Sequence, residues 1–201
     1  MEAQEWPYIV RALRQLHGVS LAQFALMTAL TEETVGRWES GRNIPDPREQ
    51  ALLRDMLTGH CRQHPTFVGL QAMVRSMGEK CTLYTPGMMV HTISPSLDDW
   101  LRQHRLDLVG TSILRRLDGL SLDMMERYAL PMLEGRSDVL SLSYKDRAVA
   151  CRRTVLQRRM SVVPMDGVRA IVLIDQPILT DDGLGMPDLD LHVVTADDVH
   201  D

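Results

Sequence analysis

Apolar residues in the first sixty positions recur at the three- and four-residue spacing of helices. One stripe runs through residues 6–17 and another through residues 48–57. Between them, Ser20 and Thr31 each precede a short segment with the same spacing, as N-cap residues do. The pattern therefore predicts an all-α domain over residues 1–59.

The next apolar stripe lies beyond a polar run. Residues 60–66 combine polar side chains with Pro65, which is typical of a domain boundary, and they predict a linker. A helix is expected over residues 67–79, with four apolar residues on one side: Phe67, Leu70, Val74 and Met77. Such a stripe needs an apolar partner, which is either the sheet of the same chain or the same helix of a second copy. We favour the second copy and predict a dimerisation helix.

From residue 80 onward the spacing becomes that of strands, interrupted by helices. The expected strands cover 81–84, 88–93, 139–144, 148–163 and 168–175, with helices over 97–104 and 121–134 and a turn at 145–147. This order predicts an α+β domain over residues 80–176, with one antiparallel sheet and helices on one face. A tail over residues 177–201 holds seven Asp and no Lys or Arg.

Composition narrows the class of protein. No apolar run reaches the ~20 residues that cross a bilayer. Three scattered cysteines, Cys61, Cys81 and Cys151, are typical of a reducing compartment. We therefore expect a cytoplasmic protein without a membrane segment. Residues 1–60 hold 6 Lys and Arg against 8 Asp and Glu, a net charge of −2, which gives little general attraction to nucleic acid.

Four arginines on the expected strand 148–163 are the strongest basic feature. Arg152 and Arg158 share one face by alternation, and Arg153 and Arg159 share the other. The pattern leaves two interpretations open, a site for an anion or acidic partner and a solvated outer face of the sheet, and we favour the solvated face. The acidic tail is either a partner for these arginines in cis or a disordered segment.

The most specific motif spans residues 18–45. Ser20 and Gln23 have the spacing of a capping box at the start of a first short helix. In a second short helix, Val35 and Trp38 lie three apart and therefore share a buried side. The remaining polar residues of that second helix are left free to meet a partner.

This segment resembles the Xre/Cro family of phage-repressor-type DNA-binding domains over about residues 6–57. The resemblance implies that the second helix of the motif enters the major groove of double-stranded DNA. It implies DNA contacts at Thr31, Glu32, Glu33, Thr34, Arg37, Arg42 and Asn43. It also implies a salt bridge between Arg14 and Glu39. Leu21 departs from the family pattern, which usually has a phosphate-binding Gln there, and a domain that binds protein instead is the alternative.

Residues 80–176 resemble a PAS-type sensor domain, through the segments MMVHTISPSLDDWL (88–101) and LVGTSILRRLD (108–118). The resemblance implies that a small ligand or cofactor binds between the sheet and the helices, and that a preceding helix forms a homodimer. We expect the methionine-rich elements to line that pocket, with Met88 or Met89 on one strand and Met124 or Met125 on the helix. Adjacent strand residues face opposite ways, so only one of Met88 and Met89 can point inward. We favour Met89, with His91 on the same side, and Met125. A haem contacted by His91 is kept as an alternative.

The sequence carries no nucleophile elbow, phosphate loop or dinucleotide fingerprint, so no enzyme activity is expected. His60, Cys61 and His64 offer only two or three metal ligands, and we favour a solvated linker there. The resulting prediction is a dimeric, sequence-specific transcription regulator under small-molecule control. The alternatives are an antitoxin-like or adaptor module that binds protein, and a regulator that senses haem or metal.

Overall fold

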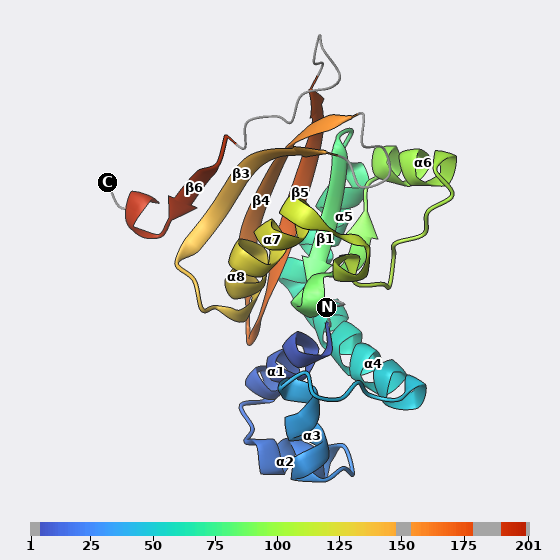
Figure 1. The fold of residues 1–201 in the computed structure, drawn as a ribbon, viewed down its shortest axis with the longest axis vertical. Coiled ribbons are helices and arrows are strands. Elements are labelled where there is room, and N and C mark those ends of the chain that lie inside the picture. Colours follow the sequence, from blue (N-terminus) through green and yellow to red (C-terminus); the bar gives the residue numbers. More distant parts are fainter. Residues whose placement is uncertain (1–4, 148–153, 179–189, 200–201) are drawn as a thin grey trace.

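A computed structural model describes residues 5–147, 154–178 and 190–199 (Figure 1). The first five helices are α1 (Trp6–His17), α2 (Leu21–Met27), α3 (Glu32–Glu39), α4 (Pro47–Gln63) and α5 (Pro65–Ser76). The strands are β1 (Lys80–Thr85), β2 (Met89–Ile93), β3 (Val139–Arg147), β4 (Val155–Met165), β5 (Val168–Ile178) and β6 (His192–Thr195). The remaining helical segments are η1 (Pro86–Met88), α6 (Pro95–Gln103), η2 (Ile113–Arg116), α7 (Gly119–Met124), the π-helix η3 (Met125–Ala129), α8 (Leu130–Glu134) and η4 (Asp197–Val199).

Side-chain caps set the starts of the N-terminal helices. The Ser20 hydroxyl accepts from the Gln23 backbone N–H at 3.2 Å, and the Gln23 side chain accepts from the Ser20 N–H at 2.8 Å. A second reciprocal box, between Asp46 and Glu49, opens α4. These local bonds satisfy backbone donors that a helix start leaves without partners, so the helices expected after residues 20 and 31 are present.

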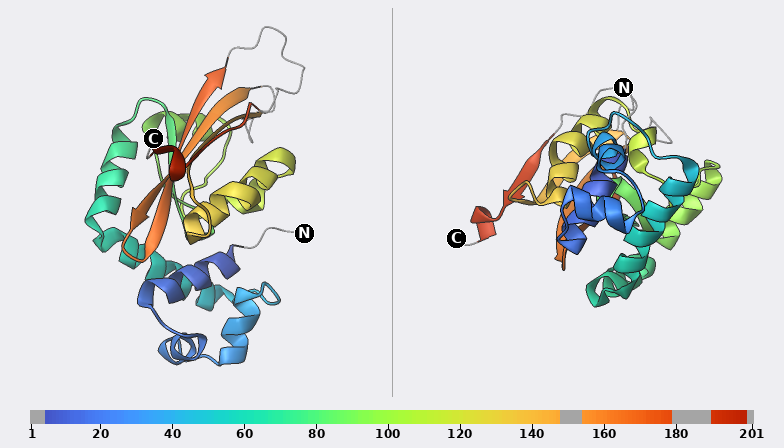
Figure 2. Two further views of the ribbon diagram at one scale, coloured as in Figure 1. Left: turned by 90° about the vertical axis from the view of Figure 1, so that its left-hand side faces the viewer. Right: turned by 90° about the horizontal axis from the view of Figure 1, so that it is seen from below.

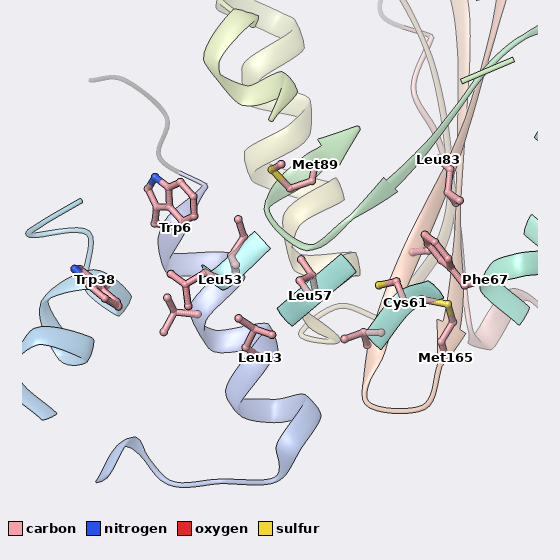
Figure 3. Packing of buried hydrophobic residues seen from close by; sticks show 14 of the residues in the cluster. Trp6, Leu13, Trp38, Leu53, Leu57, Cys61, Phe67, Leu83, Met89 and Met165 are labelled. Atoms are coloured by element: carbon pink, nitrogen blue, oxygen red, sulfur yellow. The ribbon is translucent and has the colours of Figure 1, made fainter. Parts of the chain in front are cut away.

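The N-terminal helices pack around a buried aromatic core. Trp6 of α1 and Trp38 of α3 are at most 2% exposed, and Leu53 of α4 belongs to the same cluster (Figure 3). The cluster does not end with this domain. It continues along α4 through Cys61 and reaches the sheet at Leu83, so the two halves of the chain share one core.

The six strands of the described residues form one antiparallel sheet in the order β2-β1-β5-β4-β3-β6. Helices lie between β2 and β3 in sequence, so the C-terminal domain has the expected α+β architecture. Two expectations about the later strands are wrong. The turn at 145–147 is the end of β3, where Lys145 pairs with Gln157. Part of the tail 177–201 is also strand, because β5 runs to Ile178 and β6 pairs with β3.

Helices cover both faces of the sheet, where the sequence suggested one (Figure 2). Alternation along β1 turns Cys81 and Leu83 toward the face that meets α1, α4 and α5. Tyr84, next in sequence, joins a second core with the segment of α7, η3 and α8. The central strands are therefore buried on both sides, and helix α5 of the N-terminal segment supplies the second covering layer.

The expected linker at 60–66 is not a linker. Residues 60–63 are the last turn of α4, and α5 begins at Pro65, so His64 alone separates the two helices. Cys61 is fully buried in the shared core. Arg62 and Gln63 beside it are exposed, whereas His60 and His64 are half-buried, so the polar run marks one outer side of a helix.

The apolar stripe of α5 is covered by the chain's own sheet. Phe67 and Val74 are fully buried, and Leu70 and Met77 pack against the same cluster. Of the two partners considered for this stripe, the intramolecular one is correct, and the prediction of a dimer contact through these four side chains is wrong. A helix that follows α4 after one residue is held against the sheet, where its stripe is satisfied within one chain.

We predict that Val74→Asp unfolds the protein partly or fully, because it places a charge without a partner in the shared core. The free energy of unfolding in urea should fall by several kcal/mol. Met73→Asp is the matched control on the exposed side of the same helix, with 41% of Met73 accessible, and should change it by less than about 0.5 kcal/mol. Equal effects of the two substitutions would contradict the packing of α5.

Candidate DNA interface and ligand cavity

The α2–α3 pair presents a polar helix face to solvent. The Thr31 hydroxyl caps α3 by accepting from the Thr34 N–H at 3.2 Å. Val35 and Trp38 turn into the core, as expected. The side chains proposed to contact DNA remain on the outside: Thr31, Glu32, Glu33, Arg37, Arg42 and Asn43 are exposed and Thr34 is half-buried.

The end of α3 is tied back on itself. The backbone N–H groups of Arg42 and Asn43 both donate to the Arg37 carbonyl, at 2.9 and 3.2 Å. This fixes the loop that carries the two expected phosphate contacts. The Arg37 guanidinium donates to Glu33 one turn earlier, at 2.5 Å. The outer face of α3 therefore carries an exposed ion pair, which contributes little to stability in water and is readily exchanged for a new partner.

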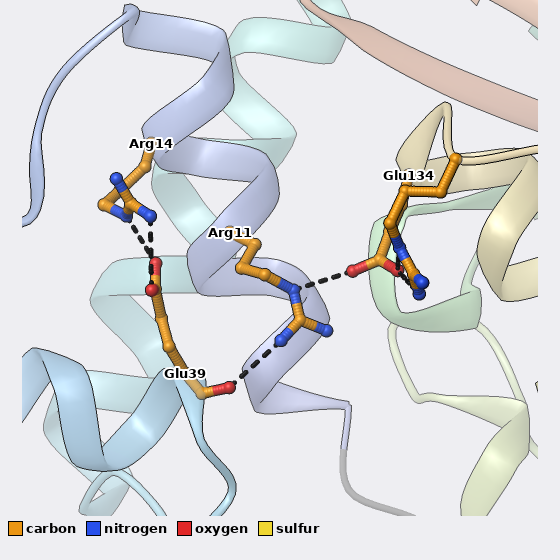
Figure 4. A network of polar contacts seen from close by, with 5 residues as sticks. Arg11, Arg14, Glu39 and Glu134 are labelled. Carbon is orange, nitrogen blue, oxygen red and sulfur yellow. Dashed lines mark hydrogen bonds and ion pairs between the residues drawn. The ribbon is translucent and has the colours of Figure 1, made fainter.

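A second ion pair joins α1 to α3, as the resemblance implied (Figure 4). The Arg14 guanidinium donates to both carboxylate oxygens of Glu39, with Nη2 3.2 Å from Oε2. Both side chains are mostly buried, at 26% and 16% exposure. The predicted Arg14–Glu39 pair is confirmed.

Arg11 extends this network to the sheet domain, and sequence reasoning missed it. Its Nη1 donates to the backbone carbonyl of Glu39 at 3.0 Å, and its Nε donates to Glu134 at the end of α8 at 2.7 Å (Figure 4). Glu134 is almost fully buried and also pairs with Arg136. The reading helix, α1 and α8 are thus joined by charged hydrogen bonds, which are stronger than neutral ones.

A cavity of about 450 Å³ lies between the sheet and its helices on the α7 side. Its size is within the usual range of small-molecule sites, about 300–1,000 Å³. The wall is mainly apolar, with Leu97, Leu101, Ile113, Leu117, Met125 and Leu173. The floor is polar and includes Asp175 and Arg158, which face each other across β5 and β4.

The polar floor is a buried charge cluster. Nε of Arg158 lies 3.9 Å from Asp175 and 4.0 Å from Asp146. The Ser121 hydroxyl of α7 donates to Asp146. Burial raises the pKa of Asp175, an effect that the positive charges of Arg158 and Lys80 partly offset. Arg158 is 5% exposed, so our expectation of a solvated face for it is wrong. Arg152 and Arg153 lie outside the described residues.

The three residues expected to line one pocket lie on opposite faces of the sheet. Met125 lines the cavity. Met89 packs on the opposite face of the sheet, in the core shared with α1. His91 lies on that face too, 4.5 Å from the Phe67 ring and 3.1 Å from Gln71. Its pKa is lowered to about 4, mainly by burial. Met88 is the methionine that turns toward the helices.

A haem in the cavity therefore cannot use His91 as its ligand. In the described part of the chain, no group of three or more His, Cys, Asp and Glu side chains is placed to hold a metal ion. Cys61 and Cys81 are free and buried, and burial raises the pKa of Cys61 to about 12. No helix among the described residues is long and apolar enough to cross a bilayer.

Comparison with known proteins agrees with the geometry of the first domain. Residues 10–49 match a family model described as Helix-turn-helix. Together with the capped α2–α3 pair and the Arg14–Glu39 bridge, this makes the N-terminal domain a helix-turn-helix domain. No curated protein sequence matches the chain.

Three solved structures are similar to the C-terminal part at low sequence identity. A single-substitution variant of RsLOV has 13% identity and a TM-score of 0.41, over 58% of this chain and 69% of that one. A sensory box sensor histidine kinase from Vibrio cholerae has 11% identity and a TM-score of 0.38, over 57% and 90%. A PAS domain from a two-component sensor histidine kinase has 9% identity and a TM-score of 0.38, over 56% and 96%. Similarities at this level assign no function to the chain.

We predict that the Arg14–Glu39 pair stabilises the docking of α1 on α3. A double-mutant cycle with Arg14→Ala and Glu39→Ala should give a coupling energy of about 1–2 kcal/mol, between the values of exposed and buried pairs. The exposed Arg102–Asp98 pair of α6 is the control and should give at most about 0.5 kcal/mol. A coupling energy near zero for Arg14 and Glu39 would show that the bridge has no role in stability.

Proposed function

We propose that this protein is a sequence-specific DNA-binding transcription regulator that acts as a homodimer and is controlled by a small molecule in the cavity. The observation that carries the DNA-binding part is the exposed face of α3 on a helix-turn-helix domain. A regulator of this type would place that face in the major groove.

The exposed side chains of α3 suit base recognition more than general attraction to phosphate. Arg37 offers a guanidinium of the kind that pairs with guanine, and a carboxylate such as Glu32 accepts from the cytosine amino group. With more acidic than basic residues in the first sixty positions, attraction to the backbone is weak. Two copies on two half-sites would double the contacts, which supports the homodimer.

Control by a ligand is supported by the position of the cavity. Met125 lines it and begins the π-helix η3, a type of irregular turn that is common at functional sites. The same helical segment ends at Glu134, which binds Arg11, and Arg11 binds the end of α3. A ligand that favours one arrangement of this segment would shift the population of reading-helix positions.

We predict that the full chain selects a defined sequence from random double-stranded DNA, containing two inverted half-sites. Arg37→Ala should weaken binding to that sequence by about 1–3 kcal/mol per half-site, because a base contact is lost from an exposed position. Affinity would be measured by fluorescence anisotropy. Arg102→Ala, which removes an exposed arginine from an equivalent pair on α6, is the control and should leave affinity unchanged.

A selection that enriches no sequence would instead favour the module that binds protein. The two acidic residues at the start of α3, Glu32 and Glu33, are the observation that keeps this second candidate open. Enrichment of single half-sites would support DNA recognition and contradict the proposed homodimer.

We predict that filling the cavity changes DNA affinity. Leu117→Trp adds bulk at the wall, and affinity should change by about fivefold or more, the lower end of common coupling energies of ~1–3 kcal/mol. Leu140→Trp on the exposed side of β3 is the control and should have no effect. Combining Leu117→Trp with Arg11→Ala should abolish the change if α8 and α1 transmit it. An unchanged affinity in Leu117→Trp would reject ligand control through this cavity.

A further inference from the structure

The polar floor of the cavity is a ladder across four neighbouring strands. Lys80 of β1 pairs in register with Asp175 of β5, Asp175 pairs with Arg158 of β4, and Arg158 pairs with Tyr144 of β3. Residues in register on neighbouring strands point to the same face, so all four side chains line up under the helices. With Asp146 beside Arg158, two cations alternate with two acids. The ladder is close to electrically balanced before any ligand enters.

Asp175 is the acid of this ladder with a buried carboxylate oxygen, Oδ1, that accepts no hydrogen bond within the described residues. Its side chain is 14% exposed and lines the cavity. The Arg158 Nε atom that it faces lies 3.9 Å away, beyond hydrogen-bonding distance. Buried carboxylates normally accept several hydrogen bonds, so this one has spare capacity for a donor that arrives through the cavity.

The residues around Asp175 indicate the chemical class of the ligand that would carry this hydrogen-bond donor. The hydroxyls of Thr82 and Tyr84 lie at the same polar end, and burial, followed by the charge of Asp175, raises the pKa of Tyr84, which keeps it neutral. Beyond them the wall is mainly apolar and includes Trp100, whose ring centroid lies 5.7 Å from the Lys80 ammonium; His104 and Arg116 are polar residues of the same wall. A ligand that fills this space is thus largely hydrocarbon, with one polar end.

We propose that the cavity binds an uncharged, largely apolar small molecule that carries a hydroxyl or amide N–H at one end and donates it to Asp175. This assignment rests on the proposed function, in which the cavity is the ligand site. A ligand carboxylate would face the carboxylate of Asp175, and Arg158 is already flanked by two acids. A ligand cation would add an unbalanced charge to a buried ladder, which is costly. An uncharged donor satisfies Asp175 and leaves the balance unchanged.

The test uses three probes with one hydrocarbon tail and different ends: decanol, decyl methyl ether and decanoate. Each is titrated into the full chain by calorimetry. Decanol should bind about tenfold or more tightly than either of the others, because a hydrogen bond to a charged acceptor is worth at least that factor. In Asp175→Asn, the preference for decanol over the ether should fall to about threefold, because the acceptor loses its charge. Asp99→Asn, an exposed acid of α6 outside the cavity, should keep the full preference.

Three results would overturn the assignment. Tightest binding of decanoate would make Arg158, Lys80 or Arg116 the anchor, and equal binding of all three would mean that apolar burial alone selects the ligand. Binding of none would exclude this ligand class, whereas the effect of Leu117→Trp on DNA affinity tests ligand control independently. If Asp175→Asn does not fold, the order of the three probes on the unmodified chain decides the matter by itself.

Discussion

Helix α1 packs against the N-terminal helices on one side and against the sheet domain on the other. Two glycines, Gly87 and Gly167, allow the close approach between α1 and the sheet domain. One side of α1 packs against α3 and α4, and the other meets η1, α8 and β5. At Gly87, where φ is +73°, a Cβ atom would lie 2.8 Å from Ile9; at Gly167, where φ is +77°, it would lie 2.9 Å from Leu16. Only glycine permits both the left-handed backbone and this close approach. The turns of the sheet domain therefore contact directly the helix on which α3 packs.

This contact offers a direct route by which a change in the sheet domain could reach α3. In a protein with a flexible linker, a signal from the sensor must act through dimer geometry or effective concentration. Here α1 is part of one core with the sheet, and Arg11 binds both Glu134 and the end of α3. Closely packed interfaces tend to switch between discrete arrangements and do not deform gradually. A small displacement of α8 would consequently favour one docking of α1 over another.

The features that were predictable from the sequence are those set by local chemistry or by a known motif. The capping box of Ser20 and Gln23 depends on residues three apart, and the Arg14–Glu39 pair came with the family pattern. The single antiparallel sheet of the C-terminal domain also agrees with the expected fold class. Each of these features can be recognised from a single sequence, because it depends either on residues close together in the chain or on a motif that recurs in many proteins.

The errors arose where a residue's partner is distant in sequence. Cys61 was assigned to a linker because its neighbours are polar, although its own side chain enters the core. The choice between Met88 and Met89 depended on η1, whose turn decides which methionine faces the helices. The match of Asp175 with Lys80 and Arg158 requires the strand register, which alternation within single strands does not supply.

His64 is the single residue between α4 and α5, and this short connection limits how the two parts of the protein can change in evolution. Readers and sensors that meet through a free linker can be exchanged by recombination, because few contacts cross the boundary. Here Cys61 and Phe67, on either side of the joint, belong to one core. A transplanted reader would also need surfaces that fit η1 and β5. The N-terminal helices and the sheet domain are therefore expected to be inherited as one unit, whereas the exposed outer face of α3 is free to vary by point substitution.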